Sequence, residues 1–309
     1  MARTTVLRYS VRCAVAATVA TVATVAGAQA PGTRVVMLGT GTPNPDPDRS
    51  GPAVAIVAGG KAYLVDAGPG VVRRASAASR LHQIDGLKAD RLDIVFITHL
   101  HSDHTVGLPD LIHTGWVAGR AVPLRVYGPP GIKEMTDYLT EAWREDIRVR
   151  TEGSQPSTKN GWKMEATVVA PGVVYRDSNL TVTAFSVLHT DWKYAFGYRF
   201  EAPDRTIVVS GDTRPTDAVV TACNGCDVLV HEVYSIKGLK ARTPEWQRYH
   251  SGSHTSALEL GDLATRARPK LLVLYHQLYW SATDEDLVSE LGSRYSGRFV
   301  SAKDLEVYP

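Results

Sequence analysis

Apolar and polar positions alternate in a way that predicts short strands and helices from Arg34 onward. In the first half, apolar runs bounded by Gly, Pro and Asp predict strands at 35–39, 53–57, 62–65, 93–98 and 123–127. Apolar residues at helical spacing predict helices at 71–81, 108–117 and 132–143. The charged, turn-rich segment 144–160 shows neither period, so we expect an irregular solvated loop or a substrate-facing arm there.

The second half of the chain continues this alternation without a linker or an internal repeat. Strands are predicted at 164–169, 180–188, 195–200, 205–210, 228–230, 271–275 and just before Tyr308. Helices are predicted at 215–222, 256–266 and 284–291, the second opened by the capping pattern Ser256-x-x-Glu259. Strand runs with helices both early and late predict two sheets packed face to face and covered outside by helices.

The first 30 residues have the pattern of a secretory signal peptide. Arg3, Arg8 and Arg12 form a basic region, 14–25 is an apolar run, and Ala28-Gln29-Ala30 matches the small-x-small cleavage pattern. The apolar run is shorter than the roughly 20 residues that a bilayer span needs, so we expect cleavage near Ala30 rather than a stable membrane anchor. The sequence thus predicts a signal peptide at 1–30, one domain at 31–309, and a periplasmic or secreted location.

Charge and cysteine content narrow the function classes further. Of 34 basic side chains, the three arginines of the signal are lost, which leaves 31 against 32 acidic side chains. Such a balance does not favour a polyanion binder. Cys223 and Cys226 predict a small disulfide or two free thiols; half of a zinc site or a redox pair is disfavoured, because no second pair or thioredoxin-like context accompanies them.

The densest candidate site is the segment Thr98-His99-Leu100-His101-Ser102-Asp103-His104 at the end of an apolar run. In extended chain, His99 and His101 point to the same side, while Asp103 and His104 lie one step further on. Imidazole and carboxylate are ligands that Zn²⁺ prefers, and this arrangement suits two adjacent cations. A solvated polar turn is the alternative, but crowded and unpaired histidines and carboxylates gain nothing from burial at a strand end.

Four later residues share the same chemistry. His189, Asp212 and His276 follow or end predicted strands, and His254 precedes a predicted helix. Side chains at the ends of several strands meet at one edge of a sheet, which is how a rigid scaffold assembles a metal site from distant segments.

The order of these motifs resembles the metallo-β-lactamase superfamily, and within it the ribonuclease Z-like and arylsulfatase-like members. The matching motifs, which cover essentially the whole chain after the signal, are Leu38-Gly39-Thr40-Gly41, Val65-Asp66-Ala67-Gly68-Pro69-Gly70, the His-x-His-x-Asp-His run, Tyr127-Gly128-Pro129-Pro130-Gly131-Ile132, His189 with Phe196-Gly197-Tyr198, Ser210-Gly211-Asp212-Thr213-Arg214-Pro215, His231-Glu232, His254-Thr255-Ser256-Ala257 and His276. The resemblance implies an α/β (α+β) fold, a four-layer αβ/βα sandwich with a dizinc site at one edge.

The same resemblance implies the roles of the ligands. His99, His101 and His189 would bind the first zinc ion, Asp103, His104 and His276 the second, and Asp212 would bridge them. Mixed nitrogen and oxygen ligation also admits Mn²⁺ or Fe²⁺.

Two adjacent cations lower the pKa of a shared water toward neutrality and stabilise charge on substrate oxygens. Asp103 can then orient the resulting hydroxide, while His254 is the candidate acid for the leaving oxygen and Glu232 its partner. Asp66 is expected to hold a ligand histidine rather than to bind metal. The remaining histidines are expected to be surface or hydrogen-bonded residues: His82, His113, His231 and His250.

These motifs are compatible with three functions. The leading expectation is an exported dizinc hydrolase of an anionic sulfate- or phosphodiester-type ester, with Trp192 and Lys193, beside Tyr194, as an aromatic and cationic substrate wall. The alternative is a ribonuclease Z-type endonuclease for tRNA 3′ ends; the signal, the balanced charge and the lack of a long basic arm count against such a nucleic-acid partner. A metal-binding or redox module without turnover is the third. A homodimer is compatible with each of them.

Overall fold

Seven strands form the first sheet, in the order β14-β1-β2-β3-β4-β5-β6. The structure is a computed structural model that describes residues 1–2 and 32–309, so the predicted signal falls almost entirely outside the described residues. The strands β14, β1, β2 and β3 pair antiparallel, and β3 to β6 pair parallel. Their bounds are β1 Arg34–Gly39, β2 Ala53–Ala58, β3 Lys61–Val65, β4 Ile94–Phe96, β5 Leu124–Gly128, β6 Met164–Val168 and β14 Val307–Tyr308.

The second sheet also has seven strands, in the order β13-β12-β11-β10-β9-β8-β7. Here β7 to β10 pair antiparallel, and β10 to β13 pair parallel. The bounds are β7 Gly172–Arg176, β8 Thr181–Ser186, β9 Phe196–Ala202, β10 Arg205–Val209, β11 Val228–Tyr234, β12 Leu271–Leu278 and β13 Phe299–Ser301. Each sheet thus joins an antiparallel half to a parallel half.

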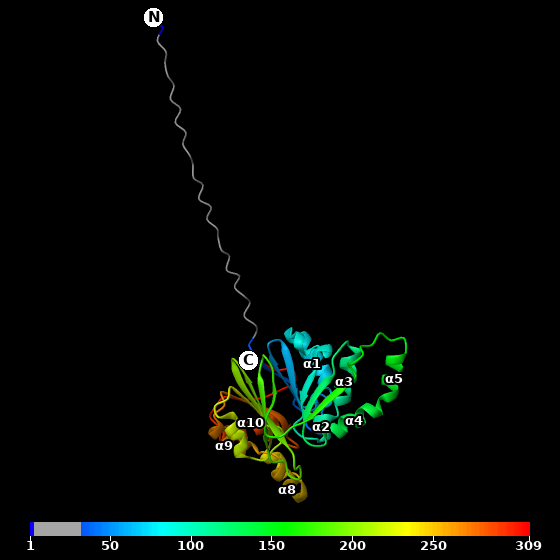
Figure 1. Cartoon of the computed structure of the whole chain (residues 1–309). Coiled ribbons are helices and arrows are strands. Elements are labelled where there is room, and N and C mark those ends of the chain that lie inside the picture. Colours follow the sequence, from blue (N-terminus) through cyan, green and yellow to red (C-terminus); the bar gives the residue numbers. More distant parts are fainter. Residues whose placement is uncertain (3–31) are drawn as a thin grey trace. The chain divides into compact units, whose positions relative to one another are not determined.

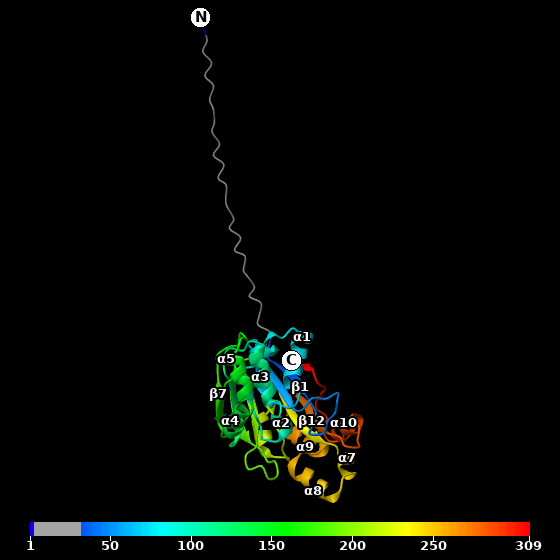
Figure 2. The ribbon, with the colours of Figure 1, turned by 90° about the vertical axis from the view of Figure 1, so that its right-hand side faces the viewer.

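Helices cover the outer face of each sheet (Figure 1, Figure 2). On the first sheet lie α1 Val71–His82, η1 Asp85–Leu87, η2 Ala89–Arg91, α3 Leu108–Val117 and α4 Ile132–Ala142. On the second lie α6 Asp217–Cys223, α9 Ala257–Ala267 and α10 Asp284–Gly292. The other helices are α2 Ser102–Thr105, α5 Arg144–Glu152, α7 Ile236–Lys240 and α8 Pro244–Ser253.

The strand periodicity explains these layers. Along β1, Val35 and Met37 pack into the core between the sheets, whereas Val36 and Leu38 pack under the helices of the first sheet. Because successive strand residues face opposite sides, a strand that is apolar throughout is buried on both faces. The predicted four-layer αβ/βα sandwich is therefore confirmed.

The expectation of an irregular segment at 144–160 was wrong for its first part, which is the helix α5. Only Ile147 in α5 is buried, so no apolar stripe marks the helix in the sequence. Ion pairs at helical spacing, Arg148 with Glu145 and Arg150 with Asp146, support it instead. The helices α7 and α8 and the strand β7 were likewise not predicted.

The two cysteines form a disulfide, Cys223–Cys226, rather than two free thiols. It joins the end of α6 to the turn that precedes β11, and both residues are buried. Asn224 and Gly225 between them have positive φ angles, as a tight turn requires. In the part of the chain that the structure describes, no helix is long and apolar enough to cross a bilayer.

Candidate metal centre

The clustered histidines lie where strands of both sheets end. The segment after β4 carries His99 and His101, and the short helix α2 then turns Asp103 and His104 toward them. A buried hydrogen bond from the Ile97 N–H to the Tyr127 carbonyl holds the start of this segment against β5. The first sheet thus supplies one half of the site.

The second sheet supplies the other half. His189 lies beyond β8, and Asp212 lies beyond β10, after Gly211 with its φ of 62°. His276 lies within β12, where the pairing with β11 shifts by one residue, and its own φ is 45°. Such a bulge re-aims a side chain, and here it brings the His276 ring to the edge of the site.

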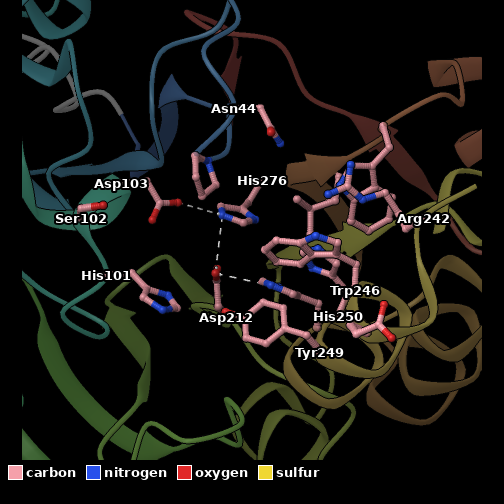
Figure 3. Close-up of a pocket in the computed structure, with 15 residues that line it drawn as sticks. Asn44, His101, Ser102, Asp103, Asp212, Arg242, Trp246, Tyr249, His250 and His276 are labelled. Carbon is pink, nitrogen blue, oxygen red and sulfur yellow. Dashed lines mark hydrogen bonds and ion pairs between the residues drawn. The ribbon is translucent and has the colours of Figure 1, made fainter.

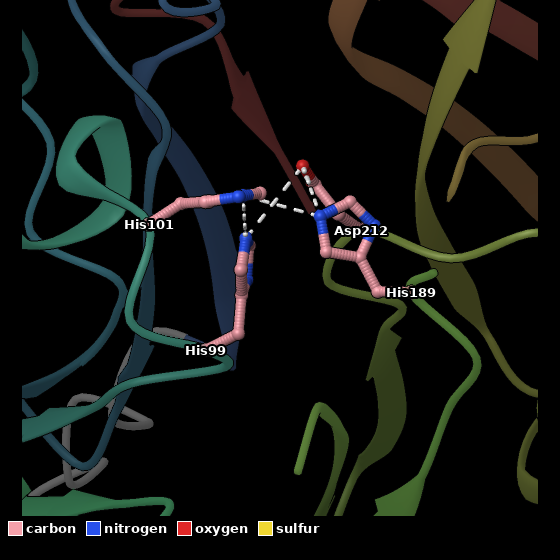
Figure 4. Close-up of side chains that lie close together, drawn as sticks. All are labelled: His99, His101, His189 and Asp212. Atoms are coloured by element: carbon pink, nitrogen blue, oxygen red, sulfur yellow. Dashed lines mark hydrogen bonds and ion pairs between the residues drawn. The ribbon is translucent and has the colours of Figure 1, made fainter. Parts of the chain in front are cut away.

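Asp212 is the centre of the cluster (Figure 4). Its carboxylate is buried, and one oxygen, Oδ2, lies within 4.0 Å of ring nitrogens from both halves of the chain. The distances from Asp212 Oδ2 are 3.9 Å to His99, 3.5 Å to His104, 4.0 Å to His189, 3.9 Å to His254 and 3.5 Å to His276.

Within the described residues, these side chains fall into overlapping groups whose ligand atoms lie within 4.8 Å of one another. Asp212 belongs to the first and third groups, and His276 belongs to the second and third, so the three groups form one cluster. The groups are His99, His101, His189 with Asp212; Asp103, His104 with His276; and Asp212, His254 with His276.

Unpaired buried atoms support a cation at this place. In the part of the chain that is described, His104 Nε2 and Asp212 Oδ1 are buried without a hydrogen-bond partner. A buried polar atom without a partner costs about 1–3 kcal/mol, so a cluster of them is unusual. Nitrogen and oxygen donors in this number match a divalent metal ion, and the residues present therefore fit one.

Electrostatics of the protein alone favour the metal-binding protonation states of the first ligand group. Burial lowers the pKa of His99 well below its ordinary value and the pKa of both His101 and His189 to about 4, so these rings are neutral. Burial opposes ionisation of Asp212, but His276 and His104 outweigh it and hold the pKa of this carboxyl well below its usual range. Neutral rings and an ionised carboxylate are the metal-binding forms. At His104 and His276, burial opposes protonation, but the Asp212 and Asp103 carboxylates outweigh it and raise the pKa, so these two rings would release a proton when a cation binds.

Hydrogen bonds from outside the cluster orient two of the rings. Asp66 Oδ2 lies 2.8 Å from His104 Nδ1, which is the placement expected for Asp66, and the Thr98 N–H donates to the other Asp66 oxygen. His189 Nδ1 lies 2.8 Å from the Ser253 carbonyl oxygen. Partners of this kind select the tautomer that points the other ring nitrogen at the metal.

His254 and Glu232 lie together on the α8 side of the cluster. Glu232 Oε1 accepts hydrogen bonds from the backbone N–H groups of Thr213 and Thr255, and Glu232 Oε2 lies 3.4 Å from His254 Nδ1. Burial raises the pKa of Glu232 well above its ordinary value and lowers the pKa of His254 to about 4. The pair is thus built to hold a proton beside the cluster.

The expected substrate wall is placed differently. Trp192 Nε1 donates a 2.8 Å hydrogen bond to His101 Nε2, so Trp192 supports a histidine of the cluster. Lys193 and Tyr194 are exposed and stack on each other, and neither they nor Trp192 line the cavity beside the cluster. Trp192 and Lys193 stay a prediction as substrate contacts, and they lie outside the lining of this cavity.

That cavity, of about 600 Å³, is lined by the metal-centre residues and by α8 (Figure 3). Trp246, Tyr249 and His250 line it, together with Arg242 and Trp280. His250 was expected to be a surface or structural residue, yet it faces this cavity. The spacing Trp246, His250, His254 at i, i+4 and i+8 was the available signal, since it puts three rings on one helix face.

Fold and site together define a metal-dependent hydrolase, and comparison with known proteins specifies its family. The pattern of a Beta-lactamase superfamily domain matches residues 61–277. A "Ribonuclease Z" of Mycobacterium bovis (strain BCG / Pasteur 1173P2) is 33% identical over 285 residues, which covers 89% of this chain and 98% of that protein. The chain belongs to the metallo-β-lactamase superfamily, in its ribonuclease Z-like branch.

A second sequence relative and a solved structure are also similar to this chain. A "Ribonuclease Z" of Mycobacterium sp. (strain KMS) is 36% identical over 247 residues, with 79% of this chain and 84% of that protein covered. The crystal structure of human tRNase Z, short form, has the same fold, with a TM-score of 0.63, 24% identity, and 89% and 98% of the two chains covered.

These relatives correct the leading expectation from the sequence. An exported hydrolase of sulfate- or phosphodiester-type small esters was the wrong choice, because the similarity at 33–36% identity runs to ribonuclease Z over most of the chain. The balanced charge and the lack of a sequence segment typical of a long basic arm were the arguments against a ribonuclease Z-type protein. The similarity to ribonuclease Z is the stronger observation.

Proposed function

We propose that the protein is a ribonuclease Z-type endonuclease that removes the 3′ trailer from tRNA precursors. The observation that carries the proposal is the similarity to ribonuclease Z over 89% of the chain, with a metal centre at the sheet edges. The substrate is then a phosphodiester, an anionic ester of the kind expected from the sequence, carried by RNA.

Two zinc ions would be held by the residues that the sequence singled out. His99, His101 and His189 would hold the first ion and Asp103, His104 and His276 the second, with Asp212 available to both ligand sets. When bound, the ions supply Lewis-acid stabilisation of charge on the phosphate and activation of a water. Mn²⁺ and Fe²⁺ satisfy the same donors less specifically.

The side chains of the protein supply the remaining steps. Asp103, whose Oδ2 lies 3.2 Å from His276 Nε2, would accept a hydrogen bond from the attacking water and so orient it. The proton shared by Glu232 and His254 goes to the leaving ribose oxygen, which would otherwise depart as an alkoxide. Backbone N–H groups hold Glu232, so His254 is positioned rather than mobile.

Cleavage of a precursor tRNA tests this proposal. The full chain, loaded with Zn²⁺, should release the trailer at one position, and elemental analysis should find two zinc ions per chain. Asp212→Asn should abolish cleavage and lower the zinc content per chain. Asp110→Asn, a carboxylate on α3 that pairs with Arg73 away from the cluster, serves as the matched control and should keep both. Uncleaved precursor with fully loaded protein would refute the proposed function.

A further inference from the structure

One wall of the cavity beside the metal centre is aromatic, and its outer rings, Trp246 and His250, belong neither to the metal ligands nor to the Glu232–His254 pair. Four roughly parallel rings lead from the cavity mouth toward the cluster: Trp246, His250, His254 and His276. Successive centroids lie 5.4, 5.5 and 5.7 Å apart, with interplanar angles of 22°, 35° and 19°. The row ends at Trp246, whose side chain remains 47% exposed.

A cationic group accompanies these rings. The Arg242 guanidinium carbon lies 5.3 Å from the centroid of the Trp246 ring and 6.0 Å from that of Trp280. Among the residues that the structure describes, no carboxylate lies within the 4 Å of an ion pair to Arg242, and its Nε is buried without a partner. Figure 3 shows Arg242 and Trp246 on the same side of the cavity.

Two details mark this wall as more than a packing surface. His250 is 8% exposed and its Nδ1 lacks a hydrogen-bond partner in the described part of the chain, although the residue lines the cavity. Trp280 has a φ of 50°, a conformation that is strained for a bulky residue and persists where the surroundings enforce it. Its ring centroid lies 4.6 Å from that of His250, so the indole packs against the wall.

We propose that Trp246, Trp280 and Arg242 form a nucleotide subsite, in which a base within a few positions of the scissile bond stacks on Trp246 and its phosphate meets Arg242. The inference rests on the proposed function and specifies how that site holds its substrate. Base stacking on an aromatic ring suits a nuclease that accepts many precursors, since every base has a π-face. An arginine without a carboxylate partner suits the phosphate that every nucleotide carries.

The row of rings also fixes the distance between this subsite and the chemistry. Trp246 is three ring steps from His276, and His276 lies 3.5 Å from the Asp212 carboxylate. These steps together exceed the length of one nucleotide, so a base on Trp246 belongs to a nucleotide within a few positions of the cleaved phosphodiester, rather than to a remote part of the RNA.

A double-substitution experiment tests the subsite. Cleavage is measured for the full-length zinc-loaded protein and for Trp246→Ala, on an intact precursor tRNA and on two abasic precursors. One abasic precursor lacks the bases of the three nucleotides on the 5′ side of the scissile bond, and the other lacks those of the three on the 3′ side. Trp246→Ala should lower kcat/KM on the intact precursor about tenfold. On one abasic precursor the same substitution should change kcat/KM less than twofold, because the stacking partner is already missing.

Controls separate the possible failures. Trp143→Ala removes another half-exposed tryptophan that does not line the cavity, and it should leave the ratio between intact and abasic precursors unchanged. Trp246→Phe should recover most of the loss, and Arg242→Gln should raise KM while leaving the dependence on the base intact. Equal effects of Trp246→Ala on all three precursors would overturn the subsite alone. Absence of cleavage by the unaltered protein would overturn the proposed function, and the subsite with it.

Discussion

Asp66 and His104 form a fully buried pair, in which Asp66 Oδ2 lies 2.8 Å from His104 Nδ1 and the opposite ring nitrogen faces the metal centre. Asp66 has a φ of 61°, a conformation that Asn also tolerates. The pair therefore offers a substitution that removes a charge without disturbing the backbone.

Asp66→Asn should weaken metal binding about 10–100-fold, because the carboxylate fixes the His104 tautomer and raises the basicity of the ring. The measurement is competition for Zn²⁺ against a chelator of known affinity, with Asp110→Asn as a carboxylate control outside the site. An unaltered zinc affinity would mean that Asp66 serves packing alone.

Removal of metal should destabilise the whole domain. Without cations, the cluster buries ionised Asp103 and Asp212 among histidines, several of whose atoms have no other partner in the described residues. Metal at a hundredfold excess over its Kd stabilises the folded state by about 3 kcal/mol, so dialysis against EDTA should lower the Tm, and Zn²⁺ should restore it. A Tm that changes with neither treatment would contradict the metal centre.

Asp177 should stabilise the fold in a pH-dependent way, far from the metal centre. Burial alone would raise the pKa of Asp177, but hydrogen bonds from the Tyr63 and Tyr175 hydroxyls and the Asn179 N–H outweigh burial and lower the pKa to about 2. A lowered carboxyl pKa contributes stability that is present above about pH 4 and is lost as the pH falls toward 2.

Asp177→Asn should therefore cost about 2 kcal/mol at pH 7, and progressively less between pH 4 and pH 2. Denaturant unfolding of both proteins at pH 7, and at the lowest pH where the unaltered chain still folds, measures the difference. A loss that is equal at both pH values would show that the ionised form of Asp177 has no special role.

The Cys223–Cys226 disulfide should matter for stability and not for catalysis. It closes a loop of four residues, for which the chain-entropy estimate is about 2 kcal/mol. The paired substitution Cys223→Ser and Cys226→Ser should lower the free energy of unfolding by that amount and leave kcat unchanged. Loss of activity with intact folding would revive the redox interpretation of these cysteines.

The location of the protein remains a prediction. If 1–30 is a signal peptide, N-terminal sequencing of the protein from a fractionated cell should begin at Pro31, in the periplasmic or secreted fraction. A cytoplasmic chain that retains Met1 would contradict the signal peptide, and it would agree with the proposed action on tRNA precursors.

The sequence predicted the strand-end positions well because burial on both faces leaves a strong signal. The runs before His99 and His276 are continuous and apolar, so the polar residues that end them stood out. The segment that carries α5 could not be recognised in the same way, since its helix is held by surface ion pairs such as Arg148 with Glu145. The spacing of apolar residues does not predict a helix that buries so little of its surface.

The substrate side of the site was the least predictable part. Trp192 and Lys193 were chosen for their closeness in sequence to His189, whereas the cavity wall comes from α8, more than 50 residues further along. Which segment faces a cavity depends on how loops cross the edges of the sheets, and no single-sequence pattern encodes that crossing.

The split origin of the ligands links cation capture to chain assembly. His99, His101, Asp103 and His104 lie in one half of the polypeptide, and His189, Asp212 and His276 in the other. Each half supplies most of one sheet, and the C-terminal strand β14 completes the sheet of the first half. Neither half alone retains a complete donor set. A tightly held pair of ions can thus form only after both halves have docked, so metal content measures how much of a preparation has reached its native tertiary structure.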